Sequence, residues 1–155
     1  EIVVFLDADL DLPPEQVPAF LERQRTTGVD VLVGAKQQSM EPGRYPALRR
    51  VLSKTFSLVT SLLFRLPVEE TQTGLKSFRR EALNETLPKL QIMRYSFDLE
   101  LIVRVNRAGY SIAAAPVELA VGASATGVSL RTLWEMGRDT FLIWVRSFSW
   151  PKGQA

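Results

Sequence analysis

An apolar segment that ends abruptly in acidic residues limits what this chain can fold into. Residues 2–6 are all apolar, and Asp7, Asp9 and Asp11 follow them at alternate positions. Because an unpaired carboxylate is very costly to desolvate, the segment is predicted to be a buried strand that leaves its sheet at this point. Open α/β sheets bind ligands at the carboxyl ends of their strands. Alternate residues of extended backbone share a face, so we expect the three carboxylates to converge on a divalent cation.

Several kinds of site begin with such an acidic pattern. A calcium loop of the EF-hand type needs Gly at its sixth position and Glu at its twelfth, where this chain has Leu12 and Pro18. A phosphatase of the haloacid dehalogenase type has a small or hydroxyl residue where this chain has Asp11. Nucleotide-sugar transferases use an acidic pair to hold Mg²⁺ or Mn²⁺ against a diphosphate, and Mg²⁺ needs only one or two protein carboxylates. A plain acidic turn before a helix, favoured by the helix dipole, explains the pattern as well.

The amino-acid composition narrows the possible chemistry. The 155 residues are 46% hydrophobic and 23% charged, which is typical of one globular domain with a core. There is no Cys and no His, so thiolate chemistry, Ser–His hydrolysis and most zinc sites are excluded. Catalysis must therefore depend on carboxylates, a metal ion, Lys, Arg, Tyr or hydroxyl groups. No apolar run reaches the roughly 18 residues of a membrane span.

The charged residues are unevenly distributed along the chain. Every charged residue from Glu1 to Glu22 is acidic, whereas every one from Arg44 to Leu66 is basic. An acidic metal site facing a basic segment would suit a cleft that binds phosphates. Two oppositely charged solvated faces would give the same distribution.

Strand and helix patterns alternate along the chain. Helices are predicted over residues 13–28, 48–66, 81–87, 97–108 and 130–148, strands over 2–6, 29–34, 74–78 and 111–119, and loops over 37–46 and 121–128. This order predicts an α/β fold with a mixed, mostly parallel sheet flanked by helices. Pro116 inside the last strand argues for an edge position or a bulge.

The last helix is amphipathic and carries both tryptophans and arginines. We expect residues 1–128 to form part of a catalytic domain and residues 129–155 to form a helix and tail that suit a membrane interface. Ordinary packing of an apolar helix face onto a core explains this pattern about as well.

Several segments together match a known family in the expected order. They are VVFLDADLDLPPE, VLVGAK, LRRVLSKTF, TQTGLKSFRREAL, YSFDLELIVRVNRAGYSIAAAPVEL and GVSL. The chain resembles glycosyltransferase family 2, in its polyprenyl-phosphate branch of dolichyl-phosphate mannose synthases and glucosyltransferases. The resemblance implies a GT-A, Rossmann-like fold and the use of Mg²⁺ or Mn²⁺. It also implies inverting transfer of a hexose from GDP-mannose or UDP-glucose to a polyprenyl or dolichyl phosphate. The implied location is the cytoplasmic face of a membrane, with the membrane surface as a partner and no nucleic acid.

The resemblance also implies roles for individual residues. By position, the metal ligands are Asp7, Asp9 and Asp11, the phosphate contacts are Lys36, Arg50, Ser53, Gln72 and Lys76, and the catalytic carboxylates are Asp98 and Glu100. A phosphate acceptor is already ionised near neutral pH, so it needs little help from a base. Acids also favour the first turn of a helix, so a capping role for the two catalytic candidates stays open.

The resemblance leaves other functions open. A family 2 transferase with a soluble or polysaccharide acceptor, or a metal-binding or membrane-associating module without turnover, would share these motifs. The chain begins with Glu1 directly before a strand, and the family's first strand and helices have no counterpart here. We therefore expect a fragment whose sheet is incomplete at the N-terminus, and which alone is inactive and marginally stable.

Overall fold

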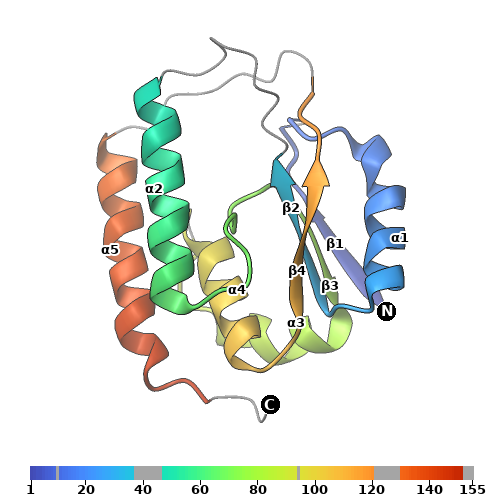
Figure 1. Ribbon diagram of the computed structural model, residues 1–155. Helices are drawn as coiled ribbons and strands as arrows, with labels where there is room; N and C mark the ends of the chain where they lie inside the picture. Colours follow the sequence, from blue (N-terminus) through green and yellow to red (C-terminus); the bar gives the residue numbers. More distant parts are fainter. Residues whose placement is uncertain (10, 37–46, 94, 121–129, 152–155) are drawn as a thin grey trace.

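The computed structural model describes residues 1–9, 11–36, 47–93, 95–120 and 130–151, with the side chains of 47–54 and 130 left out of the description. Strands and helices alternate as the sequence predicts (Figure 1). The strands are β1 (Ile2–Leu6), β2 (Val31–Lys36), β3 (Leu75–Arg79) and β4 (Ile112–Val117). The helices are α1 (Val17–Thr27), α2 (Ala47–Phe64), α3 (Arg80–Thr86), α4 (Phe97–Arg107) and α5 (Leu130–Ser147), with short 3-10 turns η1 (Pro14–Gln16) and η2 (Leu87–Lys89).

The four strands form one mixed sheet in the order β1-β3-β2-β4. Strand β2 runs parallel to β4, and β3 lies antiparallel between β1 and β2. The predicted mixed sheet flanked by helices is confirmed, but only the β2–β4 pairing among the described strands is parallel, because β3 runs against both of its neighbours. Pro116 lies in β4, an edge strand of the described sheet, where a missing N–H group is tolerated.

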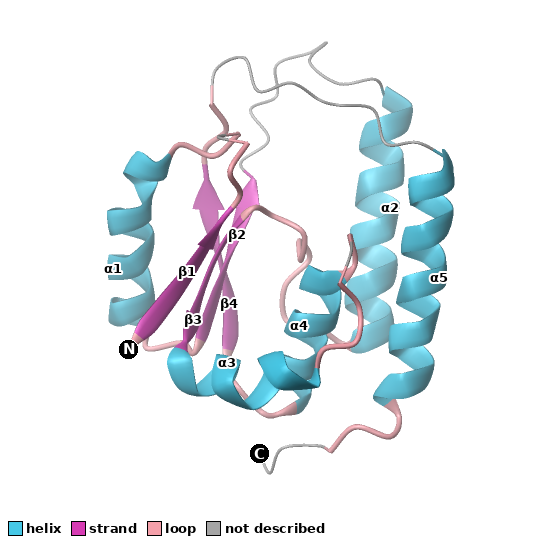
Figure 2. Cartoon of the chain, turned by 180° about the vertical axis from the view of Figure 1, so that it is seen from behind, coloured by secondary structure: helices cyan, strands magenta, loops and turns pink. Residues whose placement is uncertain are grey.

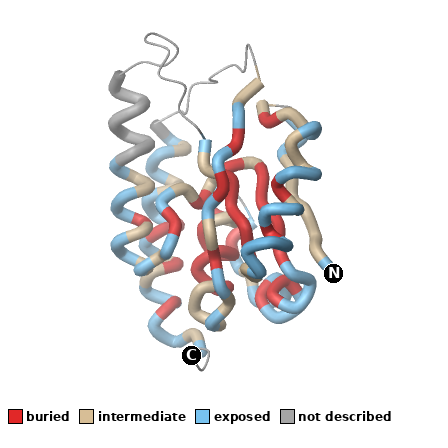
Figure 3. Tube along the Cα trace, turned by 45° about the vertical axis from the view of Figure 1, so that its right-hand side comes forward, coloured by how far each residue is buried: buried red, intermediate tan, exposed pale blue. Residues whose placement is uncertain are grey.

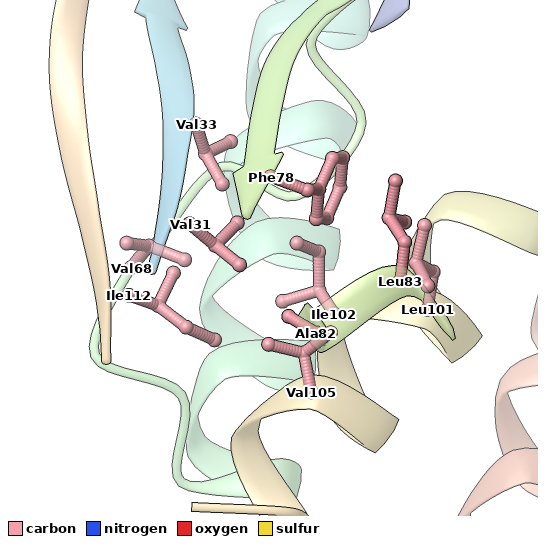
Figure 4. Packing of buried hydrophobic residues seen from close by; sticks show 10 residues of the cluster. All are labelled: Val31, Val33, Val68, Phe78, Ala82, Leu83, Leu101, Ile102, Val105 and Ile112. Atoms are coloured by element: carbon pink, nitrogen blue, oxygen red, sulfur yellow. The ribbon is translucent and has the colours of Figure 1, made fainter. Parts of the chain in front are cut away.

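Helices cover both faces of this sheet. Helix α1 packs on one face, and α3 and α4 pack on the other (Figure 2). Alternate residues of β2 separate the two interfaces, because Leu32 faces α1 whereas Val31 and Val33 face α4. Figure 4 shows the larger cluster, which consists of Val31, Val33, Val68, Phe78, Ala82, Leu83, Leu101, Ile102, Val105 and Ile112.

Helix α4 is buried on two sides. Leu101 and Ile102 pack toward the sheet, while Leu99 and Val103 pack against Ile143 of α5. Helices α2 and α5 form an outer layer beyond α4 (Figures 1 and 2). In Figure 3 the buried positions concentrate in the sheet and the helices next to it, whereas α2 and α5 are exposed along one side.

The helix ends follow local backbone chemistry. Gly28 and Gly109 take positive φ values of 71° and 88° after α1 and α4, as expected of glycine at a helix terminus. Helix α2 stops at Phe64, earlier than predicted, because Arg65 already has a φ of 52°.

Candidate active site

The candidate site lies at the edge of the sheet where three strands end. Strands β1, β2 and β4 end at this edge, and Asp7, Lys36 and Glu118 stand at or just after their ends. Strand β3 runs the other way and begins here, directly after Gly74. Figure 1 shows the arrowheads of β2 and β4 pointing toward this edge. The topology thus gathers residues from four strands at the position that the acidic motif indicated.

Asp7 continues the ladder between β1 and β3 by one residue. Its backbone N–H donates to the carbonyl of Gly74 at 2.9 Å. A Cβ on Gly74 would lie 2.4 Å from Asp7 Oδ2 and 2.7 Å from Asp7 Cγ, which is closer than non-bonded atoms approach a Cβ. Gly74 therefore leaves the space that the Asp7 carboxylate occupies, and close approach rather than a special backbone angle explains this glycine.

The predicted convergence of three acids is wrong. Strand β1 ends at Leu6, and residues 8–9 form a turn, so the alternation of an extended strand does not continue. Asp9 Oδ1 instead accepts a hydrogen bond from the backbone N–H of Asp11 at 3.0 Å, as aspartates do in turns. Among the described residues, no group of three or more acidic side chains is arranged to hold a metal ion. Asp7 and Asp9 are nevertheless both exposed at this edge.

Lys76 lies below the edge of the sheet, not at its surface. Its position on β3 has the same parity as Phe78, which faces α4, and only 2% of the residue is exposed. The ammonium lies 3.1 Å from Asp98 Oδ2 and donates a hydrogen bond to the carbonyl of Thr73. Burial puts Lys76 out of position for the phosphate contact that the resemblance implied.

The partly exposed Asp98 and the buried Lys76 form an ion pair. Burial raises the pKa of Asp98, the nearby ammonium of Lys76 opposes this rise, and the carboxylate of Asp7 adds to it. Burial also lowers the pKa of Lys76, while Asp98, Asp7 and Glu70 oppose that change. Lys76 is therefore a positive charge inside the protein that is attracted by three carboxylates: Asp98 in α4, Asp7 after β1 and Glu70 before β3.

The segment that leads into β3 is fixed on both sides. Glu70 Oε2 accepts the backbone N–H of Lys36 at 2.9 Å, which ties this segment to the end of β2. Gln72 Nε2 donates to the carbonyl of Tyr95 at 3.0 Å, which ties it to the loop before α4. Lys36 itself is exposed, so its ammonium is available at the edge.

Glu100 is placed in the interior and serves the packing of α4. It is 1% exposed, and its Oε1 accepts from Arg104 Nε at 2.8 Å. Its Oε2 accepts the backbone N–H groups of Gln91 and Ile92 at 3.0 and 2.8 Å. The Arg104 guanidinium lies 3.8 Å from the ring centroid of Trp150. With both oxygens engaged in this network, Glu100 is not free to act as the catalytic base that the resemblance implied.

Two predicted phosphate contacts remain to be placed. Arg50 and Ser53 belong to α2, but their side chains lie outside the described part of the structure.

The structure adds a residue that sequence reasoning missed. Thr73 supplies a carbonyl to Lys76, and its buried Oγ1 has no hydrogen-bond partner among the residues that the structure describes. The Thr73 methyl group also lies within 3.0 Å of the Cβ position of Gly34 on β2. The signal in the sequence that could have identified Thr73 is its position directly before Gly74.

Known proteins share both the sequence pattern and the fold. No protein-family model matches the chain. It is 25% identical over 144 residues to the glycosyltransferase AglD of Haloferax volcanii, covering 93% of this chain and 23% of that protein. It is 27% identical over 122 residues to the undecaprenyl-phosphate mannosyltransferase of Micrococcus luteus, covering 76% of this chain and 48% of that protein. The chain thus spans half or less of the length of these two relatives.

Solved structures give the same picture of the fold. Glucosyl-3-phosphoglycerate synthase from Mycobacterium tuberculosis, in complex with UDP, matches with a TM-score of 0.65 and 17% identity, over 97% of this chain and 50% of that one. Its complex with Mn²⁺, UDP and phosphoglyceric acid matches with a TM-score of 0.65 and 20% identity, over the same shares of the two chains. The resemblance to glycosyltransferases, inferred first from short motifs, is confirmed by these matches. The chain is thus a glycosyltransferase-like protein by sequence similarity, and it shares the mixed α/β fold of glucosyl-3-phosphoglycerate synthase.

Proposed function

We propose that this chain is part of an inverting transferase that moves a hexose from a nucleotide sugar, GDP-mannose or UDP-glucose, to a polyprenyl phosphate. The observation that carries the proposal is the Asp7 carboxylate, which fits into the space left by Gly74 at the carboxyl edge of the sheet. Exposed Asp9 and Lys36 lie at the same edge. The similarity to an undecaprenyl-phosphate mannosyltransferase supports a lipid-phosphate acceptor.

The acids at this edge fit a divalent cation that is shared with a substrate. Mg²⁺ and similar ions bind one or two protein carboxylates and complete their shell with water and phosphate oxygens. Asp7 and Asp9 are exposed and would hold such an ion, whereas Asp11 supports the turn through its backbone N–H. When bound, Mg²⁺ or Mn²⁺ would stabilise the negative charge that develops on a diphosphate leaving group. The Mn²⁺ complex of the structural relative is consistent with this chemistry.

The remaining residues have separate roles in the proposal. Lys36 contacts the donor phosphates, and Arg50 and Ser53 in α2 contact the lipid phosphate. Asp98 is the one predicted catalytic carboxylate that the proposal retains. Its side chain is 28% exposed, and its raised pKa makes it a stronger base than a surface aspartate. Because a phosphate acceptor is already ionised, strong base catalysis is not required, and Asp98 would act mainly through its charge close to Asp7.

With a polyprenyl-phosphate acceptor, the hexose transfer would take place at the cytoplasmic face of a membrane. In the described parts of the chain, no helix is both long and apolar enough to cross a membrane. Residues 1–128 would contribute to the catalytic domain, and residues 129–155 would approach the membrane surface. Helix α5 packs against α4 through Ile143, so any contact that α5 makes with a membrane is coupled to the helix that carries Asp98.

Titration calorimetry with Mn²⁺ and UDP or GDP tests the proposal directly. Asp7→Asn and Asp9→Asn should each weaken Mn²⁺–nucleotide binding by about tenfold, because each removes one charged ligand of the ion. Glu22→Gln, on the exposed face of α1, is the matched control and should change nothing. Unchanged affinity in both aspartate variants would refute the metal site and with it the proposed donor chemistry.

A soluble acceptor is the second candidate function. The structural relative bound to phosphoglyceric acid favours it, because phosphoglyceric acid also carries a phosphate. Transfer of labelled hexose to undecaprenyl phosphate in detergent, compared with transfer to 3-phosphoglycerate, separates the two. Product on the lipid supports the leading proposal, and product on the soluble phosphate alone supports the alternative.

A further inference from the structure

The acidic loop that follows β1 is fixed to the end of β4. We use this name for residues 7–9 and 11–16, which connect the end of β1 to the start of α1. This loop and the start of α1 lie at the same edge of the sheet as the arrowheads of β2 and β4 (Figure 1). In the described sheet, β1 and β4 are the outermost strands, with β3 and β2 between them. The acidic loop therefore spans the width of the described sheet.

Gln16 makes the hydrogen bonds at the far end of this loop. Its Nε2 donates to the carbonyl of Glu118 at 3.1 Å, and its Oε1 accepts the backbone N–H of Glu118, also at 3.1 Å. Paired residues of two antiparallel strands exchange both bonds in the same way, so the amide takes the place of a neighbouring strand beside the end of β4. Because both polar atoms of the amide take part in this pairing, Gln16 acts on the site through the backbone that it holds.

Local helix chemistry does not account for this glutamine. Gln16 is the N-cap residue of α1, a position where Ser, Thr, Asp or Asn normally accepts a hydrogen bond from the first turn of the helix. The Gln16 side chain makes no such capping bond and reaches a segment 102 residues later in the chain. Its amide is therefore used for a tertiary contact and not for the start of α1.

The middle of the loop is bound to the same segment. The carbonyl of Asp11 accepts the backbone N–H of Ala120 at 2.9 Å. Leu12, the next residue, is only 3% exposed and belongs to the core cluster against which Leu119 packs. Together with the amide pairing, these contacts fix residues 11–16 against the end of β4.

Asp9 lies between these contacts and the end of β1. On one side, Asp7 is held by the hydrogen bond from its N–H to the carbonyl of Gly74 at 2.9 Å. On the other side, Asp9 Oδ1 accepts the N–H of Asp11 at 3.0 Å, so the direction of the Asp9 carboxylate depends on the backbone of Asp11. The contacts that fix Asp11 therefore also fix the carboxylate of Asp9.

We propose that Gln16 is a positioning residue of the cation site, because it holds the acidic loop in the conformation that directs the Asp9 carboxylate. This inference rests on the proposed function, since it takes Asp7 and Asp9 as ligands of the ion. Two carboxylates that share an ion bind it more tightly when their positions are fixed beforehand, because less conformational freedom is lost on binding. Removing the amide leaves Glu118 without this pairing and loosens the contact of Asp11 beside it.

Titration calorimetry of the chain with Mn²⁺ and UDP tests the inference. Gln16→Met keeps the length of the side chain but removes both hydrogen bonds, and it should weaken Mn²⁺–UDP binding by about three- to tenfold. Thr26→Val is the matched control at the other end of α1, because it also removes a side-chain hydrogen bond, from the Thr26 hydroxyl to the carbonyl of Glu22 at 2.9 Å. This control should bind Mn²⁺–UDP as the parent does.

A double-mutant cycle separates positioning from a general structural role. If Gln16 acts through Asp9, the double variant Gln16→Met/Asp9→Asn should bind Mn²⁺–UDP within about twofold of Asp9→Asn alone, because no Asp9 charge remains to be directed. A purely structural role would weaken binding by the same factor whether or not Asp9 is present. Additive losses would therefore overturn the positioning role.

Hydrogen exchange in the absence of metal and nucleotide measures the contact itself. The backbone N–H of Glu118 should exchange at least about tenfold faster in Gln16→Met than in the parent, because its acceptor is gone. The N–H of Leu32, in the middle of the sheet, should keep its rate. Unchanged exchange at Glu118, or equal acceleration at Leu32, would contradict a local contact made by Gln16.

The outcomes distinguish this inference from the proposed function. Normal Mn²⁺–UDP affinity in Gln16→Met, together with weak binding by Asp9→Asn, overturns the positioning role and leaves the proposed function in place. A parent chain that does not bind Mn²⁺–UDP refutes the proposed function and the positioning role with it. Weak binding by Gln16→Met, together with a non-additive cycle, supports both.

Discussion

The carboxylate of Asp7 occupies the space in which a side chain at residue 74 would have to stand. A Cβ on Gly74 would come within 2.4 Å of Asp7 Oδ2, 2.7 Å of its Cγ and 2.9 Å of its Cβ. The whole Asp7 side chain would have to rotate, because the overlap extends beyond its terminal oxygen. The first acid of the motif is therefore positioned by the glycine that directly precedes β3, 67 residues later in the chain.

The first prediction concerns this glycine. Gly74→Ala should turn the Asp7 carboxylate away from the edge and weaken Mn²⁺–UDP binding by about tenfold, measured by calorimetry. Gly137→Ala is the matched control, because no described atom outside its own helix backbone and chain neighbours lies within 4 Å of its Cβ position. The control should bind Mn²⁺ normally and gain about 0.5–1 kcal/mol of stability from the better helix former. Equal affinity in Gly74→Ala and the parent would show that Asp7 is not a metal ligand.

The second prediction concerns the buried ammonium below the edge. Lys76→Met should lower the free energy of unfolding by about 3 kcal/mol, since Asp98 loses its partner in a poorly solvated site. The double variant Lys76→Met/Asp98→Asn removes both charges and should recover much of that loss. Urea unfolding of the parent, Lys76→Met, Asp98→Asn and the double variant forms a double-mutant cycle. Additive losses would mean that Lys76 and Asp98 are not coupled.

The third prediction is the pH dependence that Asp98 contributes. Burial, with Asp7 adding to it, raises the pKa of Asp98 in the folded chain above the ordinary value of about 4. The folded state then binds more protons than the unfolded state, so this contribution to stability is present at low pH and is lost as the pH rises through the folded pKa.

Urea unfolding from acid to neutral pH, in the presence of EDTA, measures this contribution. Relative to Asp98→Asn, the parent should lose stability as the pH rises above about 4. Asp7→Asn should reduce the loss, because the Asp7 charge helps to raise the pKa of Asp98. A parent that gains stability over the same range would contradict the raised pKa.

Local patterns were enough to predict the elements of the fold. Apolar runs, glycine at helix ends and Pro116 predicted the alternation of elements and the edge strand, because each of these signals acts within a few residues. The direction of β3 was not predictable in this way. Antiparallel pairing of β3 with both neighbours depends on the long connection through α2, and no short-range signal specifies it.

The candidate site was predicted in part. The motif located the edge of the sheet, but the prediction extended the strand alternation through Asp9 and Asp11, where a turn takes over. The direction of the Lys76 side chain could have been predicted, because residues 76 and 78 lie on the same face of β3 and Phe78 faces α4. Its pairing with Asp98 was not, because that contact joins two elements 22 residues apart through tertiary packing.

The last prediction separates the two acids of α4. Glu100→Gln keeps the size of the side chain but removes the charge that Arg104 pairs with, and it sets a new donor against groups that also donate. We expect the free energy of unfolding to fall by about 3 kcal/mol, as for a broken buried ion pair. Mn²⁺–UDP affinity, measured below the unfolding transition, should remain within about twofold of the parent, because the carboxylate holds Gln91 and Ile92 and not the edge of the sheet. A Glu100→Gln protein of normal stability that fails to bind the nucleotide would instead mean that Glu100 takes part in the site.

Asp98→Asn is the comparison, since the Asp98 side chain is partly exposed and lies beside Lys76 and Asp7. The contacts indicate that Glu100 stabilises the packing of α4, whereas Asp98 belongs to the site at the edge of the sheet. Only the Asp98 variant should therefore alter how Mn²⁺–UDP affinity depends on pH.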